Sequence, residues 1–319
     1  MKKVKVAVLG YGHLGKWHCQ KVEAHSNVAE FVAIVEKFGP NKEAAKTNHP
    51  QVKVVDDISE IINEIDAAII VTPTSTHHDL VKYLINNKKH VFCEKPVCSN
   101  DKEAASLKSL ATAGLVVQVG HSERFHEAWD LLKESFHNLK SPYSIRINRV
   151  APFKGRATDV DVIQDLGIHD LDLILHLFQD KPTAVTAQGY KIRTNNYDHA
   201  AIQVELTNGS RADIVLGRNA VKEVRELEVI SQSGMITVDL FTNKILNATN
   251  TQFEDQSFVK ENNYSKRDHL LLEHKHFYDS ILNSEKSVVT LEDGLKAVHL
   301  VDAALKSIES HKKELVNFG

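Results

Sequence analysis

Short apolar runs alternate with helix-like stretches along the first part of the chain. Between the runs lie segments such as "ISEIINEI", "HHDLVKYLINNKK" and "DKEAASLKSLATAG", which have the apolar spacing of helices. Alternating strands and helices are typical of a parallel sheet with helices on both faces. The pattern predicts an α/β domain over residues 1–121, with the strands "KVKVAVLG", "EFVAIVEK", "VKVVDD", "DAAIIVTPTSTHH", "HVFCE" and "LVVQVGH".

After residue 121 most segments are strand-like. "YSIRINRV", "HAAIQVEL" and "SRADIVLGR" are examples, and Asn208-Gly209 and Ser233-Gly234 are typical of hairpin turns. Two helical stretches, 266–283 and 291–311, close the chain, and the polar stretch 247–265 is expected to be a long loop. We predict a second, sheet-based α+β domain over residues 122–319, whose last helix can pack back on the first domain.

A glycine-rich turn follows the first predicted strand. Gly10, Gly12 and Gly15 form the pattern GxGxxG before a helical stretch. The first glycine permits a tight bend, the second lets the backbone approach a pyrophosphate, and the third lets helix and strand pack closely. The start of the helix offers N–H groups and a positive dipole end to phosphates. The turn predicts a dinucleotide site, although ordinary glycine turns share this pattern.

Glu36 stands near the end of the second predicted strand. It lies about 20 residues after the last glycine, where an acid accepts hydrogen bonds from ribose hydroxyls and repels a 2′-phosphate. Glu36 therefore favours NAD over NADP, while the neighbouring Lys37 weakens the repulsion. The alternative interpretation is a solvated acid at a strand end.

Two other strand ends carry candidate chemistry. Thr72-Pro73-Thr74 follows the fourth predicted strand, and Glu94-Lys95-Pro96 closes the fifth. Ligands bind parallel sheets beyond the carboxyl ends of the strands, so both segments are expected beside the glycine turn. Proline restricts the residue before it to extended backbone. Lys95 is thus a candidate catalytic lysine at the edge of the cofactor site.

The stretch 160–178 predicts a helix that is apolar on most sides. Asp165, His169, Asp172 and His176 follow one another at steps of four, three and four residues and form one polar stripe. A helix this apolar is buried, so the stripe must face partners or a ligand. Histidine titrates near neutral pH and can remove the proton of a hydroxyl group. The alternative, a metal site, lacks further clustered ligands, and we predict none.

Composition narrows the class of protein. The chain has 319 residues, of which 42% are hydrophobic and 25% charged, with a formal net charge of −3. This balance gives no reason to expect nucleic-acid or membrane binding. The three cysteines, Cys19, Cys93 and Cys98, have no framework spacing, which indicates packing roles and a reducing cytoplasm.

Four motifs together resemble the Gfo/Idh/MocA oxidoreductases. They are "GYGHLGKWH", "VTPTSTHHDL", "HVFCEKPV" and "DLGIHDLDLI", in the order in which that family carries them. Within the family, "GHSERF" and the run from Arg149 to His169 are most similar to the branch that oxidises UDP-N-acetylglucosamine at C3. That branch tends to read "GHxERFNP", and here His126 and Glu127 replace the asparagine and proline.

The resemblance implies a Rossmann domain that binds NAD, a large and mostly antiparallel C-terminal sheet, a cis peptide before Pro96, and a homodimer or homotetramer. It implies a hydride transfer from a sugar ring carbon, with Lys95, Asp165 and His169 catalytic. Arginines form two-point pairs with phosphates. The implied substrate contacts are Arg124, Arg149 and Arg156, and the cofactor contacts are Gly10, Gly12, His13, Leu14, Gly15, Glu36, Thr72, Pro73, Thr74, His77, Glu94 and Lys95.

Two alternatives stay open. One is a dehydrogenase of inositol or a simple sugar, whose substrate has no diphosphate for the arginines. The other is a non-enzymatic, dinucleotide-sensing regulator, which needs the glycine turn but neither Lys95 nor His169.

Overall fold

The computed structural model describes residues 3–110, 112–155, 158–178, 180–249 and 259–318. The chain divides into two compact units. The first consists of Met1–Ser122 and Asp268–Val298, and the second of Glu123–Arg267 and His299–Gly319. The first division falls one residue after the expected boundary at residue 121, whereas 268–298, which we had placed in the second domain, belongs to the first unit.

The first unit contains a six-stranded parallel sheet in the order β3-β2-β1-β4-β5-β6. This is the strand order of the Rossmann fold, with the chain reversing direction across the sheet between β1 and β4. The strands read as continuous apolar runs because both faces are covered. They are β1 (Val4–Leu9), β2 (Ala29–Val35), β3 (Lys53–Val55), β4 (Ala67–Ile70), β5 (His90–Glu94) and β6 (Val117–Gly120).

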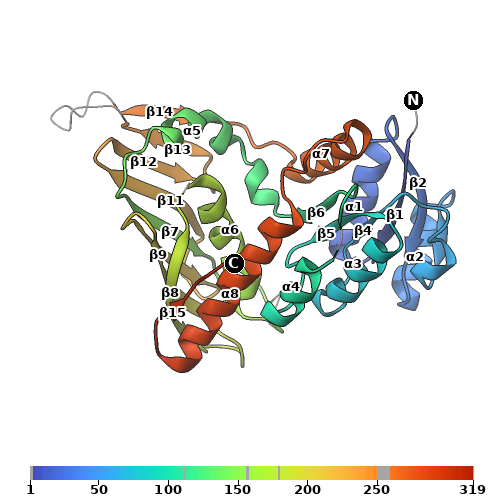
Figure 1. The fold of residues 1–319 in the computed structure, drawn as a ribbon, viewed down its shortest axis with the longest axis horizontal. Helices are drawn as coiled ribbons and strands as arrows, with labels where there is room; N and C mark the ends of the chain where they lie inside the picture. Colours follow the sequence, from blue (N-terminus) through green and yellow to red (C-terminus); the bar gives the residue numbers. More distant parts are fainter. Residues whose placement is uncertain (1–2, 111, 156–157, 179, 250–258, 319) are drawn as a thin grey trace. The chain divides into compact units, whose positions relative to one another are not determined.

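Helices cover this sheet (Figure 1). Two differ from prediction. "ISEIINEI" forms only a 3₁₀ turn, Ile58–Glu60, with a capping box of Asp57 and Glu60 at its N-terminus. The stretch from Asp101 is helical only as far as Lys108. The three cysteines are free and buried, and burial raises the pKa of Cys98 to about 12. The helices are α1 (His13–Ala24), α2 (Gly39–Asn48), α3 (His77–Asn86) and α4 (Asp101–Lys108).

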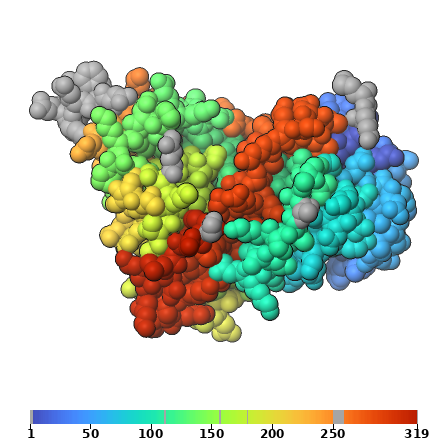
Figure 2. All heavy atoms as spheres, viewed as in Figure 1, coloured from blue at the N-terminus to red at the C-terminus, as the bar shows by residue number. Residues whose placement is uncertain are grey.

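One further helix of this unit comes from late in the sequence. In α7 (His269–Asn283), Phe277 and Tyr278 belong to the same buried apolar cluster as Val6, Val8 and Phe92. The outer side of α7, drawn in orange, stays at the surface beside the blue start of the chain (Figure 2). His274 of this helix is fully buried, because α7 turns that side chain toward His18 of α1.

The second unit is built on a nine-stranded sheet in the order β14-β13-β12-β11-β7-β10-β9-β8-β15. Among the strands that the structure describes here, only β7 and β10 pair in parallel, so the sheet is mixed and mostly antiparallel. Both predicted hairpins are present, between β9 and β10 and between β11 and β12. The strands are β7 (Ser144–Val150), β8 (Pro182–Tyr190), β9 (His199–Leu206), β10 (Arg211–Gly217), β11 (Val224–Ser231), β12 (Gly234–Asp239), β13 (Lys244–Asn247), β14 (Lys260–Asn263) and β15 (Glu314–Leu315).

Helices α5 (Glu127–His137) and α6 (Ile168–Leu177) lie on one face of this sheet (Figure 1). A Cβ atom at Gly167 would lie 2.7 Å from the Leu216 side chain of β10, so α6 approaches the sheet closely at its start. Helix α8 (Leu291–Ser310) spans the division between the units. The expected loop 247–265 is wrong in part, since it contains β14, and its residues 250–258 lie outside the described residues. No helix among the described residues is long and apolar enough to cross a bilayer.

Candidate active site

The glycine turn has the geometry that its sequence predicts. Gly10 has a φ of +98°, and a Cβ atom there would lie 2.7 Å from the carbonyl oxygen of Val71. A Cβ atom at Gly15 would overlap the carbonyl oxygen of Gly10. Gly12 differs, because no described atom lies within 4 Å of its Cβ position. The turn is therefore packed from within and open at Gly12.

Helix α1 begins at this open position. Gly12 is its N-cap, and the described residues place no side-chain cap on the N–H groups of the first turn. His13 and Leu14 are both exposed there. Uncapped N–H groups with the positive dipole end suit a pyrophosphate, so these residues fit the predicted cofactor.

Glu36 ties the end of β2 to the glycine turn. Its Oε2 accepts the N–H of Tyr11 at 2.8 Å and its Oε1 accepts the N–H of Phe38 at 2.8 Å. Each carboxylate oxygen can accept more than one hydrogen bond, so the carboxylate is held in place and can still accept ribose hydroxyls. Lys37 forms an exposed ion pair with Asp57 at 3.4 Å.

His77 joins the two other strand ends. Its Nδ1 lies 2.7 Å from the carbonyl oxygen of Pro96 and its Nε2 lies 2.8 Å from that of Thr72. The side chain is buried, with 1% of the residue exposed. The imidazole therefore connects the segments after β4 and β5, and the role that we keep for His77 is to hold these loops.

Lys95 follows directly after β5. The Lys95–Pro96 peptide is cis, as the resemblance implied, and Lys95 is partly buried. The preceding Glu94 points inward, with 8% of the residue exposed. Its Oε1 lies 3.0 Å from Nε2 of His18. Glu94, which the resemblance groups with the cofactor contacts, is thus a buried acid next to the main chain of Lys95.

In the second unit the predicted helix 160–178 is not uniform. Residues Ile163–Gly167 form a π-helical turn, and α6 follows from Ile168. Such turns are rare and frequently occur at functional sites. The wider turn changes the direction of Asp165 relative to His169 from that of a regular α-helix. Both residues are partly buried, whereas His176 is exposed.

The aspartates of α6 bind arginines. Asp172 is fully buried and accepts Nε and Nη2 of Arg124 at 2.8 and 2.6 Å, so this member of the polar stripe faces an arginine. Asp170, which we had not singled out, pairs with Arg149 in the same two-point manner, at 2.8 Å to Nε and 2.7 Å to Nη2. Arg156 lies outside the described residues.

Arg149 has a second arginine opposite it. Arg225 of β11 is its cross-strand partner, and like charges directly opposite on a sheet repel. Glu123 contacts both guanidinium groups, so its carboxylate offsets that repulsion. Burial alone would lower the pKa of Arg149, but the charges of Asp170 and Glu123 raise it above its ordinary value. Burial lowers the pKa of Arg225.

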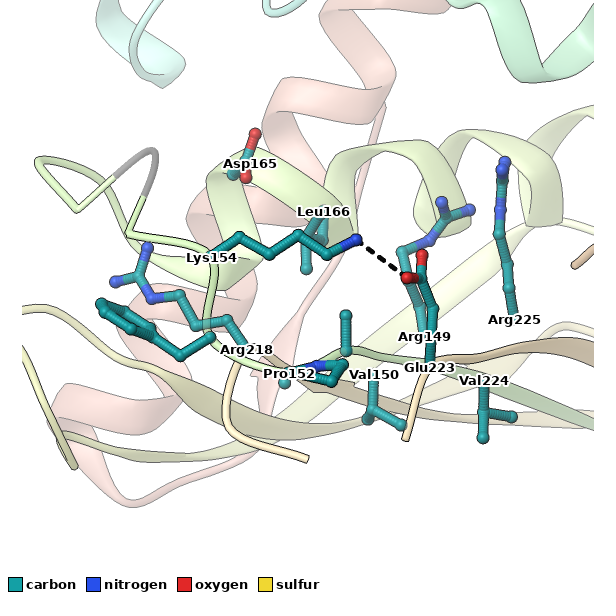
Figure 3. Close-up of a pocket in the computed structure, with 13 residues that line it drawn as sticks. Arg149, Val150, Pro152, Lys154, Asp165, Leu166, Arg218, Glu223, Val224 and Arg225 are labelled. Atoms are coloured by element: carbon teal, nitrogen blue, oxygen red, sulfur yellow. Dashed lines mark hydrogen bonds and ion pairs between the residues drawn. The ribbon is translucent and has the colours of Figure 1, made fainter. Parts of the chain in front are cut away.

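These arginines line a pocket of about 200 Å³ within the second unit. Figure 3 shows Arg149 and Arg225 extending from the sheet toward the helical segment that carries Asp165. The pocket brings together Asp165 and Arg149 of the predicted site. Residues that we had not predicted also line it, because they carry no local motif; the charged ones are Lys154, Arg218, Glu223 and Arg225.

Lys154 and Arg218 are held differently. Lys154 pairs with Glu223 at 2.8 Å, and both side chains are exposed. Arg218 donates its Nε to Asp198 at 2.7 Å, and Asp198 is fully buried. Asp198 also accepts the N–H groups of Ile192, Arg193 and Thr194 at 2.6–2.9 Å. Lys154 can change partners at little cost, whereas Arg218 is part of the fold.

The parallel sheet, the open glycine turn and the acid at the end of β2 define a nicotinamide-dinucleotide-binding protein of the Rossmann type. Comparison with known proteins identifies the family: the chain belongs to the Gfo/Idh/MocA oxidoreductases. Residues 4–121 match the model of that family's NAD-binding Rossmann fold, and residues 142–237 match one of its C-terminal domains.

Two relatives show the range within the family. The chain is 33% identical over 248 residues, 77% of each chain, to a UDP-N-acetylglucosamine 3-dehydrogenase of Acidithiobacillus ferrooxidans. It is 26% identical to a scyllo-inositol 2-dehydrogenase (NAD(+)) of Bacillus subtilis, over 97% of this chain and 95% of that one.

A solved structure of UDP-N-acetylglucosamine 3-dehydrogenase from Acidithiobacillus ferrooxidans superposes with a TM-score of 0.87 at 27% identity. The superposition covers 97% of this chain and 99% of the other. The expected family, the two-part fold, NAD as cofactor and an oxidoreductase activity are thereby confirmed.

Because Gly12 and Gly15 have different surroundings, we expect an alanine at Gly12 to weaken NAD binding and an alanine at Gly15 to lower stability. Gly12→Ala should raise the Kd for NAD by about tenfold or more, a loss of roughly 1.4 kcal/mol, with little change in stability, since the added methyl group occupies the space of the pyrophosphate. Gly15→Ala should lower the free energy of unfolding by about 1–3 kcal/mol. Fluorescence titration with NAD and urea denaturation measure the two. Equal stability losses in both variants would contradict the assignment.

Asp198 predicts a pH-dependent stability. Burial acts to raise its pKa, but the backbone N–H groups and Arg218 lower it below the ordinary value. A lowered folded-state pKa stabilises the protein above the unfolded-state value of about 3.9, and this contribution is lost as the pH falls. Asp198→Asn should therefore cost roughly 3–5 kcal/mol at pH 7, and the difference should narrow below about pH 4. Urea denaturation at pH 7 and pH 3 checks this, and a constant difference would contradict it.

Proposed function

We propose that this protein oxidises the C3 hydroxyl of a UDP-linked N-acetylhexosamine with NAD as hydride acceptor. The observation that carries the proposal is the placement of Asp165 at the wall of the charged pocket, on the helical segment that carries His169. The 33% identity to a UDP-N-acetylglucosamine 3-dehydrogenase supports the choice of substrate. An inositol or simple-sugar dehydrogenase is the second candidate, supported by the relative named for scyllo-inositol.

The proposed reaction removes one hydride and one proton from the sugar. When bound, NAD would supply the hydride acceptor for the ring carbon. His169 takes the hydroxyl proton as general base, and Asp165 orients His169 or a neighbouring hydroxyl group. Lys95 stabilises the negative charge that develops on the oxygen. The products are a keto-sugar, NADH and a proton, and in the reverse direction His169 is the general acid.

Of the predicted cofactor contacts, His77 and Glu94 are proposed to support the site from behind, and the others are proposed to face the cofactor. Gly12, His13 and Leu14 are proposed to face the pyrophosphate, and Glu36 the ribose. Thr72, Pro73 and Thr74 are proposed to border the nicotinamide side. A cytoplasmic location and a homodimer or homotetramer formed through the sheet of the second unit stay predictions.

We propose that the side chain of Lys154 binds the diphosphate of the substrate in place of its present partner Glu223. Because Lys154 is paired only with the exposed Glu223, a phosphate can replace that carboxylate at a cost of about 0–1 kcal/mol. Arg156, two residues along the chain, is proposed to assist. Arg124 and Arg149 stay proposed substrate contacts. Their variants are poor tests, because removing one partner of a buried pair costs roughly 3–5 kcal/mol by itself.

The catalytic roles predict losses in turnover without loss of cofactor binding. Lys95→Ala and His169→Ala should each lower kcat by about 10²–10⁴-fold, while the Kd for NAD stays near that of the parent protein. Exposed residues on the neighbouring α4 and on α6 supply the controls, Lys102→Ala and His176→Ala, which should keep parental turnover. Initial rates of NADH formation with UDP-N-acetylglucosamine measure this. Near-parental kcat in both Lys95→Ala and His169→Ala would remove the proposed roles.

The substrate assignment predicts a selective rise in KM. Lys154→Ala should raise the KM for UDP-N-acetylglucosamine by about one to two decades, the equivalent of one charge-assisted contact. It should leave the KM for NAD unchanged. Arg146→Ala removes an equal charge from the outward face of β7, where Arg146 pairs with Glu228 at 3.2 Å, and should change neither constant. If the parent protein oxidises free inositol or glucose as fast as the UDP-sugar, the second candidate function is favoured.

A further inference from the structure

A chain of buried polar side chains runs through the first unit from Glu94 to Tyr278. Nε2 of His18 lies 3.0 Å from Oε1 of Glu94, and Nδ1 of His18 lies 2.9 Å from Nε2 of His274. Nδ1 of His274 lies 3.3 Å from the hydroxyl group of Tyr278. His18, His274 and Tyr278 are fully buried, and the ring of Phe92 packs against both imidazoles. Each polar atom therefore depends on its neighbour in the chain rather than on water.

The chain has a direction. Burial lowers the pKa of His274 well below its ordinary value, and the nearby His18 and His25 lower it further, so His274 is neutral and has one N–H group. The carboxylate of Glu94 can only accept, so His18 donates to it through Nε2. In the arrangement with one N–H group on each ring, His274 donates through Nε2 to His18, and the hydroxyl of Tyr278 donates to His274. These tautomers follow from the hydrogen-bond partners. Every bond then donates toward Glu94.

The carboxylate of Glu94 connects this chain of hydrogen bonds to Lys95. Its Oε2 accepts the backbone N–H of Lys95 at 3.3 Å. A Cβ atom at residue 120 would lie 2.8 Å from Oε1 of Glu94, so Gly120 leaves the space that the carboxylate occupies. Beyond the lysine, His77 holds the carbonyl oxygen of Pro96. The main chain of Lys95 is thus fixed from both sides.

We propose that His274 is a positioning residue for Lys95, which it holds in place through His18 and Glu94. His274 bonds Nδ1 of His18 and so holds the imidazole with Nε2 toward the carboxylate of Glu94. Without His274, Nδ1 of His18 loses its buried partner, and the ring is no longer held in the orientation that bonds the carboxylate. The proposal rests on the role proposed above for Lys95. A residue about 180 positions away in the sequence therefore takes part in the reaction without touching the substrate.

The test compares three substitutions in α7 with UDP-N-acetylglucosamine and NAD as substrates. His274→Phe keeps an aromatic ring but ends the chain at His18, and kcat should fall by about tenfold to a hundredfold, the loss that a small displacement of a reacting group causes. The KM for the sugar and the Kd for NAD should change little. His274→Gln keeps an amide N–H that can reach His18, and should restore most of kcat. Tyr278→Phe removes only the last donor and should lower kcat by about two- to tenfold.

The matched control is Phe277→Leu, in the same helix and the same apolar cluster but outside the chain of hydrogen bonds. It should lower the melting temperature as His274→Phe does, yet leave kcat near the parental value. The proposal is overturned if kcat of His274→Phe is parental, or if kcat falls in both variants in proportion to melting temperature. It is also overturned if His274→Gln regains stability without regaining kcat. Near-parental kcat in Lys95→Ala would instead refute the proposed function, which separates the two failures.

Discussion

The first unit is organised around one buried carboxylate. Glu94 ends a strand that is buried on both faces, and a carboxylate in that position is costly unless hydrogen bonds satisfy it. His18 from α1 supplies one, the N–H of Lys95 supplies another, and Gly120 of β6 provides the space. Satisfying this one group therefore brings a helix and two strands into register around the lysine. The glycine turn at the start of α1 and the loop after β5 consequently share a common support.

Much of the fold could be predicted from local patterns. The six strands of the first sheet and the two hairpins of the second are short-range signals, and they are present. The segment Ile58–Glu60 has a capping box of Asp57 and Glu60 at its start, but it is shorter than its apolar spacing indicated. The return of α7 to the first unit is different in kind. Its partners lie near the start of the chain, and no spacing within α7 itself identifies them.

In the candidate site, too, motifs identify some residues and only the packing identifies others. Motifs predicted Lys95, Asp165 and His169, and the glycines of the turn, because each motif reports a local backbone requirement. The partners of the arginines could not be predicted from motifs. Asp172 lies in the predicted polar stripe of α6 and Asp170 lies outside it, and only the tertiary packing decides which arginine each one meets. Arg225 reaches the pocket because β11 pairs with β7 in a register that places it opposite Arg149.

The order in which the chain is synthesised adds a consequence. The first unit needs residues Asp268–Val298, which leave the ribosome only after all the strands of the second unit except β15. Domains generally fold as units during synthesis, but here the nascent Rossmann domain waits with Phe92 and His18 uncovered until α7 arrives. The second unit has by then received nearly all of its own strands. A ribosome-bound chain stalled before residue 268 would thus carry an almost complete second half and an unfinished first half, the reverse of their order in the gene.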